Sequence, residues 1–243
     1  LCKYNCCFMK KILVISALFP PEPVVSANLS FDITSKLSEK FNVTVLSPFP
    51  SRPNGKFYNV QNKSNSSFEH LYVNSYISKK SNIFSRFSES LSFGLKSLKF
   101  IRENHYQYDS IYMNSWPLIA QFLTIFEAKR NSIPVVTHVH DLYPESLIQK
   151  IPYFKKIFYH VLLPIDKYIL NNSKYVVTIS KSMRELLIIS RGLPSSKINV
   201  AYNWQDETLF NKINHNITDI EENFKFMYAG SISNLAVIED LIL

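Results

Sequence analysis

Short apolar runs rich in β-branched residues recur along the chain, and longer amphipathic stretches separate them. Such runs are typical of strands buried on both faces of a parallel sheet, with helices in the crossover connections. A chain of 243 residues is long enough to bury such a core. We expect strands over residues 11–16, 42–47, 109–113, 133–139, 175–180 and 197–202. The sequence therefore predicts an α/β fold with a doubly wound parallel sheet.

The stretches between the expected strands carry apolar residues at helical spacing. Leu29, Ile33 and Leu37 form one stripe, and Ser26 before them is a plausible N-cap. A second stripe contains Phe84, Phe87, Leu91, Leu95, Leu98 and Ile101. The predicted helices cover residues 26–40, 83–102, 117–129, 152–171 and 180–189. A polar, aperiodic stretch over residues 52–68 predicts a long surface loop.

Changes in composition divide the chain into parts. Residues 1–8, ahead of Met9, contain all three cysteines and are expected to be an extension outside the fold. Residues 9–205 form the expected first domain, residues 206–223 a polar linker, and residues 224–243 one strand and the start of a helix of a second domain. One strand and part of a helix cannot bury their apolar faces alone. We therefore expect a fragment of a longer product.

The formal charge of +8 favours anionic partners, such as nucleic acid, acidic lipid headgroups or a phosphorylated small molecule. No recognised DNA- or RNA-binding motif appears in the sequence, so we expect no nucleic-acid partner. The sequence has no run of 18 apolar residues that could cross a bilayer, and its start makes a poor signal peptide. We expect a cytoplasmic protein.

Three polar segments follow predicted strands. Pro21, Glu22 and Ser26 come after the first strand. Residues 137–146, THVHDLYPES, come after a later one, and Ser180 begins the last predicted helix. In open parallel sheets ligands bind beyond the carboxyl ends of the strands, and a helix N-terminus can hold an anion. We expect all three segments to face one cleft.

The segment THVHDLYPES allows three interpretations. His138 and His140 could hold a metal, but no further His or Cys with suitable spacing completes such a site, and we expect no metal. His138 could instead be packed in the sheet, with His140 and Asp141 at the start of an ordinary loop. We favour a ligand-contacting lip, because an imidazole and a carboxylate at a strand end can bind hydroxyls and transfer protons.

Four segments in order resemble one family: MKKILVISALFPPEP, HDLYPES, ISKSMRELLIISRGLPSSKINVAYNW and FKFMYAGSIS. Together they are similar to the nucleotide-sugar glycosyltransferases of family 4 with the GT-B fold, in the branch that builds bacterial capsule, O-antigen or colanic-acid-type polysaccharide. The resemblance covers residues 9–243. It implies a first Rossmann-like domain that binds a lipid-linked saccharide acceptor and a second that binds the nucleotide sugar. Transfer would retain the anomeric configuration and need no cofactor.

The resemblance also implies roles for single residues. His140 and Asp141 match the catalytic strand-end positions that face the reacting sugar. Glu145 lies on the same segment, and Asn203 matches the strand-end turn that leads into the second domain. With the strand-end residues Pro21, Glu22, Ser26 and Ser180, these two complete the predicted substrate-binding set. Gly230 and Ser231 match the turn that approaches the donor diphosphate. Many relatives have a glycine pair where this chain has Val24 and Val25, which puts a phosphate contact there in doubt.

In relatives, residues that bind the diphosphate and sugar of the donor correspond to positions beyond Leu243. We therefore expect residues 1–243 alone to be inactive. Two other functions stay open: a non-catalytic binding domain or remnant of a disrupted gene, and a sugar-nucleotide epimerase of the same architecture. Two basic, aromatic-rich helices could dock on anionic lipid, unless their aromatic residues belong to the core. The basic residues are Lys79, Lys80, Arg86, Lys96, Lys99 and Arg102 in one helix region and Lys155, Lys156 and Lys167 in the other.

Overall fold

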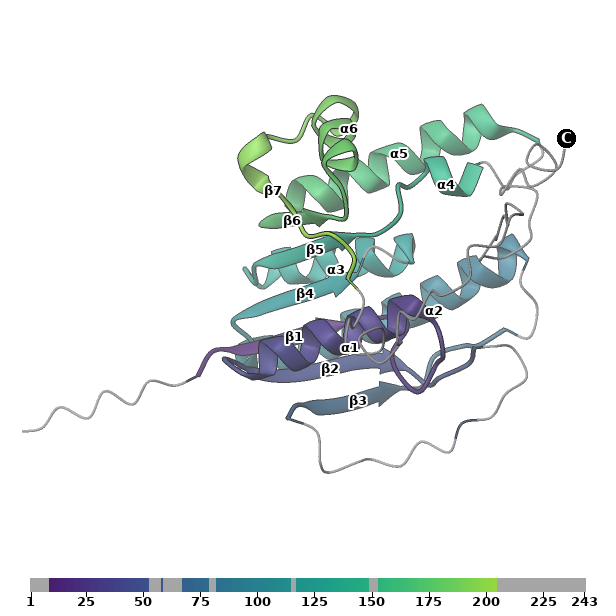
Figure 1. Ribbon diagram of the computed structural model, residues 1–243. Coiled ribbons are helices and arrows are strands. Elements are labelled where there is room, and N and C mark those ends of the chain that lie inside the picture. The colour runs from purple at the N-terminus through teal and green to yellow at the C-terminus, as the bar shows by residue number, and fades with distance from the viewer. Residues whose placement is uncertain are drawn as a thin grey trace, which may run out of the picture. The chain divides into compact units, whose positions relative to one another are not determined.

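Parallel strands form a single sheet in the computed structural model, which describes residues 9–52, 58, 67–78, 82–114, 117–148 and 153–204 (Figure 1). By its contacts the chain divides into Leu1–Trp204 and Gln205–Leu243. The second unit lies outside the described residues, and with it the predicted linker, the strand over residues 224–229, Gly230 and Ser231. Residues 1–8 lie outside them as well.

The sheet of the described region has seven strands in the order β3-β2-β1-β4-β5-β6-β7, and all its pairs are parallel. The strands are β1 Lys11–Ile15, β2 Asn42–Pro48, β3 Glu69–Val73, β4 Ser110–Asn114, β5 Val135–Val139, β6 Tyr175–Thr178 and β7 Ile198–Val200. The helices are α1 Val25–Ser38, α2 Ile83–Asn104, α3 Leu118–Arg130, α4 Glu145–Ile148, α5 Lys155–Asn172 and α6 Lys181–Arg191. Short 3-10 turns occupy His105–Gln107 and Ser195–Lys197. The predicted doubly wound α/β fold is confirmed.

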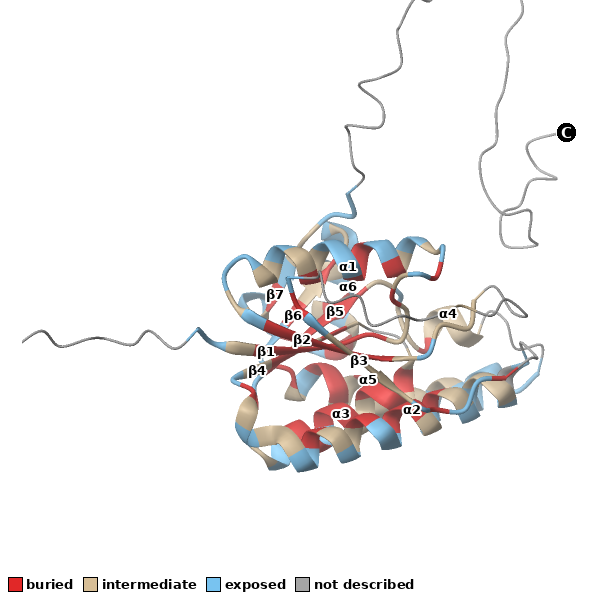
Figure 2. Cartoon of the chain, turned by 90° about the horizontal axis from the view of Figure 1, so that it is seen from below, coloured by how far each residue is buried: buried red, intermediate tan, exposed pale blue. Residues whose placement is uncertain are grey.

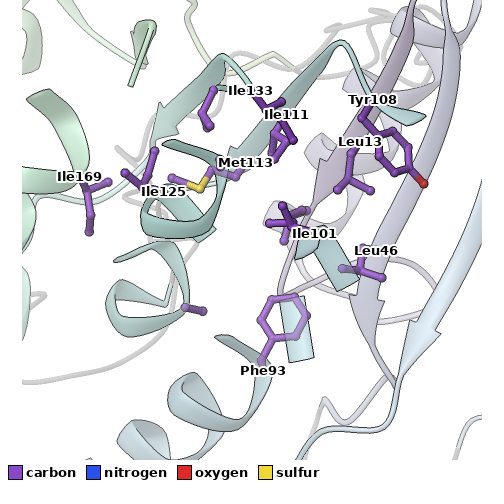
Figure 3. Close-up of a cluster of buried hydrophobic side chains, with 14 of the residues drawn as sticks. Leu13, Leu46, Phe93, Ile101, Tyr108, Ile111, Met113, Ile125, Ile133 and Ile169 are labelled. Carbon is purple, nitrogen blue, oxygen red and sulfur yellow. The ribbon is translucent and has the colours of Figure 1, made fainter. Parts of the chain in front are cut away.

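The helices form two layers around the sheet. Helices α1 and α6 cover one face, and α2, α3 and α5 cover the other (Figure 2). Side chains of β1 alternate between the layers, since Leu13 and Ile15 join one core cluster while Ile12 and Val14 join another. Figure 3 shows the larger cluster, in which strand residues such as Leu13 meet Phe93 and Ile101 of α2.

Two local predictions are wrong. Helix α1 begins at Val25, and the residue in the N-cap position is Val24, which makes no side-chain cap. Ser26 lies in the first turn, where its carbonyl oxygen accepts a hydrogen bond from Ser30 Oγ. The edge strand β3 was missed, because its sequence EHLYV carries polar residues and only partly buried side chains.

The buried face of α2 is rotated by roughly 100° about the helix axis from the stripe that the pattern implies. Phe84, Phe87, Leu91 and Leu95 of that stripe are exposed and Ile101 is buried, together with Ser90, Phe93, Gly94 and Ser97. Helix α3 packs on this buried, mostly small-residue face. Small residues allow two helix backbones to approach closely, and this packing outweighs the burial of the larger side chains.

Gly94 lies where α3 packs closely against α2. A Cβ atom at this position would lie 2.8 Å from Ala120 Cα and 2.8 Å from Leu123 Cδ1. We expect Gly94→Ala to lower the free energy of unfolding by about 1–3 kcal/mol through overpacking, although alanine is the better helix former. Urea denaturation would measure this. Ser88→Ala on the exposed side of α2 is the control, and a Gly94→Ala variant at least as stable as the parent would contradict the packing argument.

Candidate functional site

The strand order places a ligand cleft at the carboxyl ends of β1 and β4. The chain winds from β1 outward to β2 and β3, and then crosses over to β4 on the other side of β1. Connections leave these two neighbouring strands in opposite directions, so a crevice opens between them. This is the topological switch point at which open α/β sheets bind ligands.

A cleft of about 200 Å³ occupies this position. It is lined by Ser16, Ala17, Leu18, Ser26, Arg52, Asn114, His140 and Asp141. The structure thus brings together Ser26, His140 and Asp141 from the predicted site. Sequence reasoning missed Ser16, Arg52 and Asn114, although Ser16 and Asn114 carry the same signal as His140, a polar residue at the end of an apolar strand.

Hydrogen bonds fix the orientation of Asn114 in this cleft. Ser16 Oγ donates to the carbonyl oxygen of Leu18 at 2.6 Å, and Ser30 Oγ donates to that of Ser26 at 2.7 Å. Both hydroxyls can then accept protons from Asn114 Nδ2, which lies 3.1 Å from Ser16 Oγ and 2.7 Å from Ser30 Oγ. The amide oxygen must therefore point elsewhere. It is buried and has no hydrogen-bond partner in the described region, so it is an unsatisfied acceptor in the wall of the cleft.

His138 and His140 differ in their surroundings. His138 is 2% exposed and its Nδ1 lies 2.5 Å from Tyr112 Oη, as expected for a histidine packed in the sheet. His140 stacks on it with ring centroids 4.1 Å apart and reaches the cleft. Burial lowers the pKa of His140, against the opposing effect of Asp141. His140 is therefore a neutral imidazole at pH 7 that can accept a proton, beside the exposed carboxylate of Asp141.

Glu145 lies further from the cleft and is held by a buried arginine. Arg191, whose side chain is fully buried, donates to both oxygens of Glu145 at 2.8 Å and 2.6 Å. It also donates to Asp166 Oδ2 at 2.7 Å and to the carbonyl oxygen of Tyr143 at 2.6 Å. Although burial opposes it, these bonds hold the pKa of Glu145 below its usual value. Arg191 thus ties the segment after Asp141 to α5 and α6.

The other predicted site residues have the following places. Glu22 is buried, and its Oε1 accepts backbone N–H bonds from Ser51 and Arg52 at 2.7 Å and 2.9 Å. Ser180 caps α6 by accepting a bond from the Met183 N–H at 3.1 Å. Pro21 and Asn203 are exposed, and none of these four lines the cleft described above. Within the part of the chain that the structure describes, no three His, Cys, Asp or Glu side chains are placed to hold a metal ion.

The family follows from sequence comparison. A family model described as Glycosyltransferase Family 4 matches residues 28–208, which is well over half of the chain. The chain therefore belongs to this family. No curated protein matches it.

Solved structures with the same fold include GT-B proteins, one of which was solved with a nucleotide. Anabaena HepE in complex with UDP and glucose has a TM-score of 0.53 and 16% identity, over 83% of this chain and 46% of its own. Sucrose-phosphate synthase from Thermosynechococcus elongatus has a TM-score of 0.52 and 12% identity, over 79% of this chain and 47% of its own. The chain thus spans about half the length of these structures. At such identities the likeness shows a common Rossmann-like GT-B fold.

We expect Arg191→Met to lower the free energy of unfolding by about 3–5 kcal/mol, because it leaves the buried carboxylate of Asp166 and the partly buried carboxylate of Glu145 without their cation. Adding Glu145→Gln and Asp166→Asn is expected to restore part of the loss. Lys181→Met, an exposed site on α6, is the control. Chemical denaturation at pH 7 would measure these values, and a loss no larger than that of the control would contradict the role of Arg191.

Stability is also expected to depend on pH through two buried histidines. Burial lowers the pKa of His138 to about 3 and that of His70 to about 4. Below pH 6.5 these histidines take up protons in the unfolded chain but stay neutral in the folded chain. The free energy of unfolding therefore has its full value above pH 6.5 and decreases as the pH falls below it. His138 contributes a slope of up to about 1.4 kcal/mol per pH unit. Urea denaturation at pH values from 7 to 5 would measure this dependence. A His138→Gln variant whose free energy of unfolding changes with pH as steeply as that of the parent would refute it.

Proposed function

We propose that the chain forms the acceptor-binding part of a retaining glycosyltransferase. Its reaction would move a sugar from a nucleotide sugar to a lipid-linked saccharide in the synthesis of bacterial surface polysaccharide, such as capsule or O-antigen. The observation that carries this proposal is the cleft at the switch point, with His140 and Asp141 on its lip. Membership of glycosyltransferase family 4 supports the reaction class.

The cleft suits an acceptor that presents hydroxyl groups. Asp141 and the unpartnered amide oxygen of Asn114 are both hydrogen-bond acceptors, and neutral His140 can accept a proton. In the proposed step the acceptor oxygen bonds to the anomeric carbon as the bond from that carbon to the nucleotide phosphate breaks. The proton of the hydroxyl leaves toward the groups on this lip. Asp141 and His140 orient and activate the hydroxyl, and the transfer uses no metal cofactor.

A nucleotide sugar is the proposed donor. HepE was solved with UDP and glucose and also with UDP-glucose, which supports a donor of this class. The proposed donor-binding residues Gly230 and Ser231 lie outside the described region. The expectation that residues 1–243 alone do not turn over stays a prediction, and a radiolabelled nucleotide-sugar assay with lipid extract would check it.

Exposed apolar residues support peripheral contact with an anionic membrane. On α2, Phe84 is 84% exposed and Phe87 is 52% exposed, and at the start of α5 a second group is exposed. This group contains Tyr153, Phe154, Ile157, Phe158 and Val161, next to the exposed Lys155 and Lys156. The alternative interpretation, in which the aromatic residues belong to the hydrophobic core, is correct for Phe93 but not for the exposed residues named above. The N-terminal ends of α2 and α5 project in the same direction, beyond the carboxyl edge of the sheet (Figures 1 and 2).

The proposed membrane association is peripheral, through contact of these exposed residues with the membrane surface. Among the described residues, no helix has the length and apolar character needed to cross a membrane. Aromatic side chains insert into the interface through their apolar area, and each lysine beside them is attracted to anionic headgroups by about 1 kcal/mol. We propose a location at the inner face of the plasma membrane.

Acceptor binding is tested by NMR of the 15N-labelled chain with detergent-solubilised lipid-linked saccharides. We expect chemical-shift changes at Asn114, His140 and Asp141. Asp141→Asn is expected to weaken binding about tenfold, because a charged hydrogen-bond acceptor is lost. Glu103→Gln, at the far end of α2, is the control. Shifts confined to other surfaces, or equal binding by Asp141→Asn, would refute the assignment of the cleft.

Membrane contact is tested by sedimentation with vesicles of phosphatidylcholine, with and without phosphatidylglycerol. We expect binding only to the anionic vesicles, and a severalfold loss in the double variant Phe84→Ser and Phe87→Ser. Ile189→Ser, which removes an equally exposed apolar residue from α6, is the matched control. Binding that ignores lipid charge, or that the two aromatic substitutions leave unchanged, would exclude this docking surface.

A further inference from the structure

A second, smaller hollow of about 40 Å³ adjoins the cleft. Ala17 and Arg52 line both of them, so the two are neighbours along the carboxyl edge of the sheet. We call this hollow the arginine pocket, after Arg52 and Arg86 in its wall. Its volume is small, and a group of the size of one phosphate would fill it.

The arginine pocket has more cations than carboxylates in its wall. Arg86 Nη1 lies 2.8 Å from Glu89 Oε2, and Arg52 Nη2 lies 3.5 Å from the same oxygen. The other oxygen of Glu89 accepts the Ser78 N–H at 2.8 Å. Two guanidinium groups thus share one carboxylate oxygen, and all three side chains are about one quarter exposed or less.

Glu22 is the other carboxylate close to this cluster. It lies near enough to Glu89 for the two charges to interact, and burial is the main cause that raises its pKa. Its Oε1 is occupied by the backbone N–H groups of Ser51 and Arg52, and Glu22 does not line the pocket. The surface that a ligand would meet therefore carries two positive charges and one negative charge.

The wall of the arginine pocket also contains exposed apolar side chains. Tyr76 is 54% exposed and Ile77 is 39% exposed, and both line it. Asp141 lines only the cleft, Arg52 lines both hollows, and the two apolar residues line only the pocket. The guanidinium group of Arg52 therefore lies between the hydroxyl-binding lip of the cleft and these apolar side chains.

We propose that Arg52 and Arg86 bind the phosphate that joins the saccharide of the acceptor to its lipid. The inference rests on the proposed lipid-linked acceptor and assigns a subsite to it. A guanidinium group matches a phosphate in shape and charge and can form paired hydrogen bonds with it. The order of surfaces is that of a saccharide, a phosphate and a hydrocarbon chain along one molecule. Glu89 holds the two arginines in place and partly offsets their charge.

Calorimetric titration with farnesyl diphosphate tests this subsite. This compound carries a diphosphate and an isoprenoid chain but no sugar. We expect it to bind more tightly than farnesol, which lacks phosphate, and more tightly than inorganic pyrophosphate, which lacks the chain. Arg86→Gln and Arg52→Gln are each expected to weaken it about tenfold through loss of a charged hydrogen-bond donor. Glu89→Gln is expected to tighten it, because the competing negative charge is removed.

Arg102→Gln is the matched control for Arg86→Gln. Arg102 lies on the same helix and pairs with Glu127 at 3.0 Å, away from the pocket. We expect this variant to bind farnesyl diphosphate as the parent does. Thermal unfolding of every variant checks that it is folded. Unchanged binding in Arg86→Gln, or weaker binding in Glu89→Gln, would overturn the subsite.

Two further comparisons distinguish this subsite from a general affinity for lipid phosphate and from the proposed function itself. If Arg86→Gln weakens binding to phosphatidylglycerol vesicles as much as binding to farnesyl diphosphate, the pocket recognises any lipid phosphate and the acceptor assignment is overturned. If farnesyl diphosphate binding ignores Arg86 while saccharides still shift His140 and Asp141, the subsite fails and the proposed function stands. The reverse pattern shows a phosphate site in the arginine pocket without acceptor binding in the cleft, which removes the proposed function and, with it, the assignment of this phosphate to the acceptor.

Discussion

The crossover from one half of the sheet to the other, between β1 and β4, is the constraint on which the candidate site depends. Because connections leave these neighbouring strands in opposite directions, a crevice opens beyond their carboxyl ends. Short polar side chains stand at these strand ends. Ser16, directly after β1, donates to the backbone oxygen of Leu18, and Asn114, the last residue of β4, donates to the hydroxyls of Ser16 and Ser30. The same geometry leaves acceptor atoms facing a cleft, which gives the protein a surface suited to hydroxyl-rich ligands.

A second interaction keeps the lip of this cleft in place. The segment from His140 to Ile148 contains only one short helix, α4, and could not hold a fixed conformation by itself. Arg191 supplies the missing constraint from the last turn of α6, where it binds both Glu145 and the Tyr143 carbonyl oxygen. Glu145 is therefore best understood as the anchor of the lip, whereas His140 and Asp141 line the cleft.

Much of the fold could be predicted from the sequence, because continuous apolar runs and long amphipathic stretches have few alternatives to a covered parallel sheet. Strand β3 could not, since an edge strand buries too little to leave a pattern. The face of α2 was also misjudged, because periodicity locates a stripe without saying what covers it. Glu22 and Glu145 show the same limit for the site. Their sequence position is compatible with ligand binding, and only the partners of their carboxylates reveal a structural use.

The lengths of the elements carry a consequence for the site. Helix α2 has 22 residues and is roughly 33 Å long, whereas the five-residue strand β1 spans roughly 17 Å. A helix of this length must extend past the edge of the sheet on which it packs, so that only part of it is supported by the core. Its supported part begins near Ser90, which meets the start of α3, and its projecting turns carry Arg86 and the exposed aromatic residues. One residue inserted before Ser90 would rotate the projecting N-terminal turns of α2 by about 100° relative to the rest of the helix. Arg86 would then point away from Arg52, while the packing of the core would be unchanged.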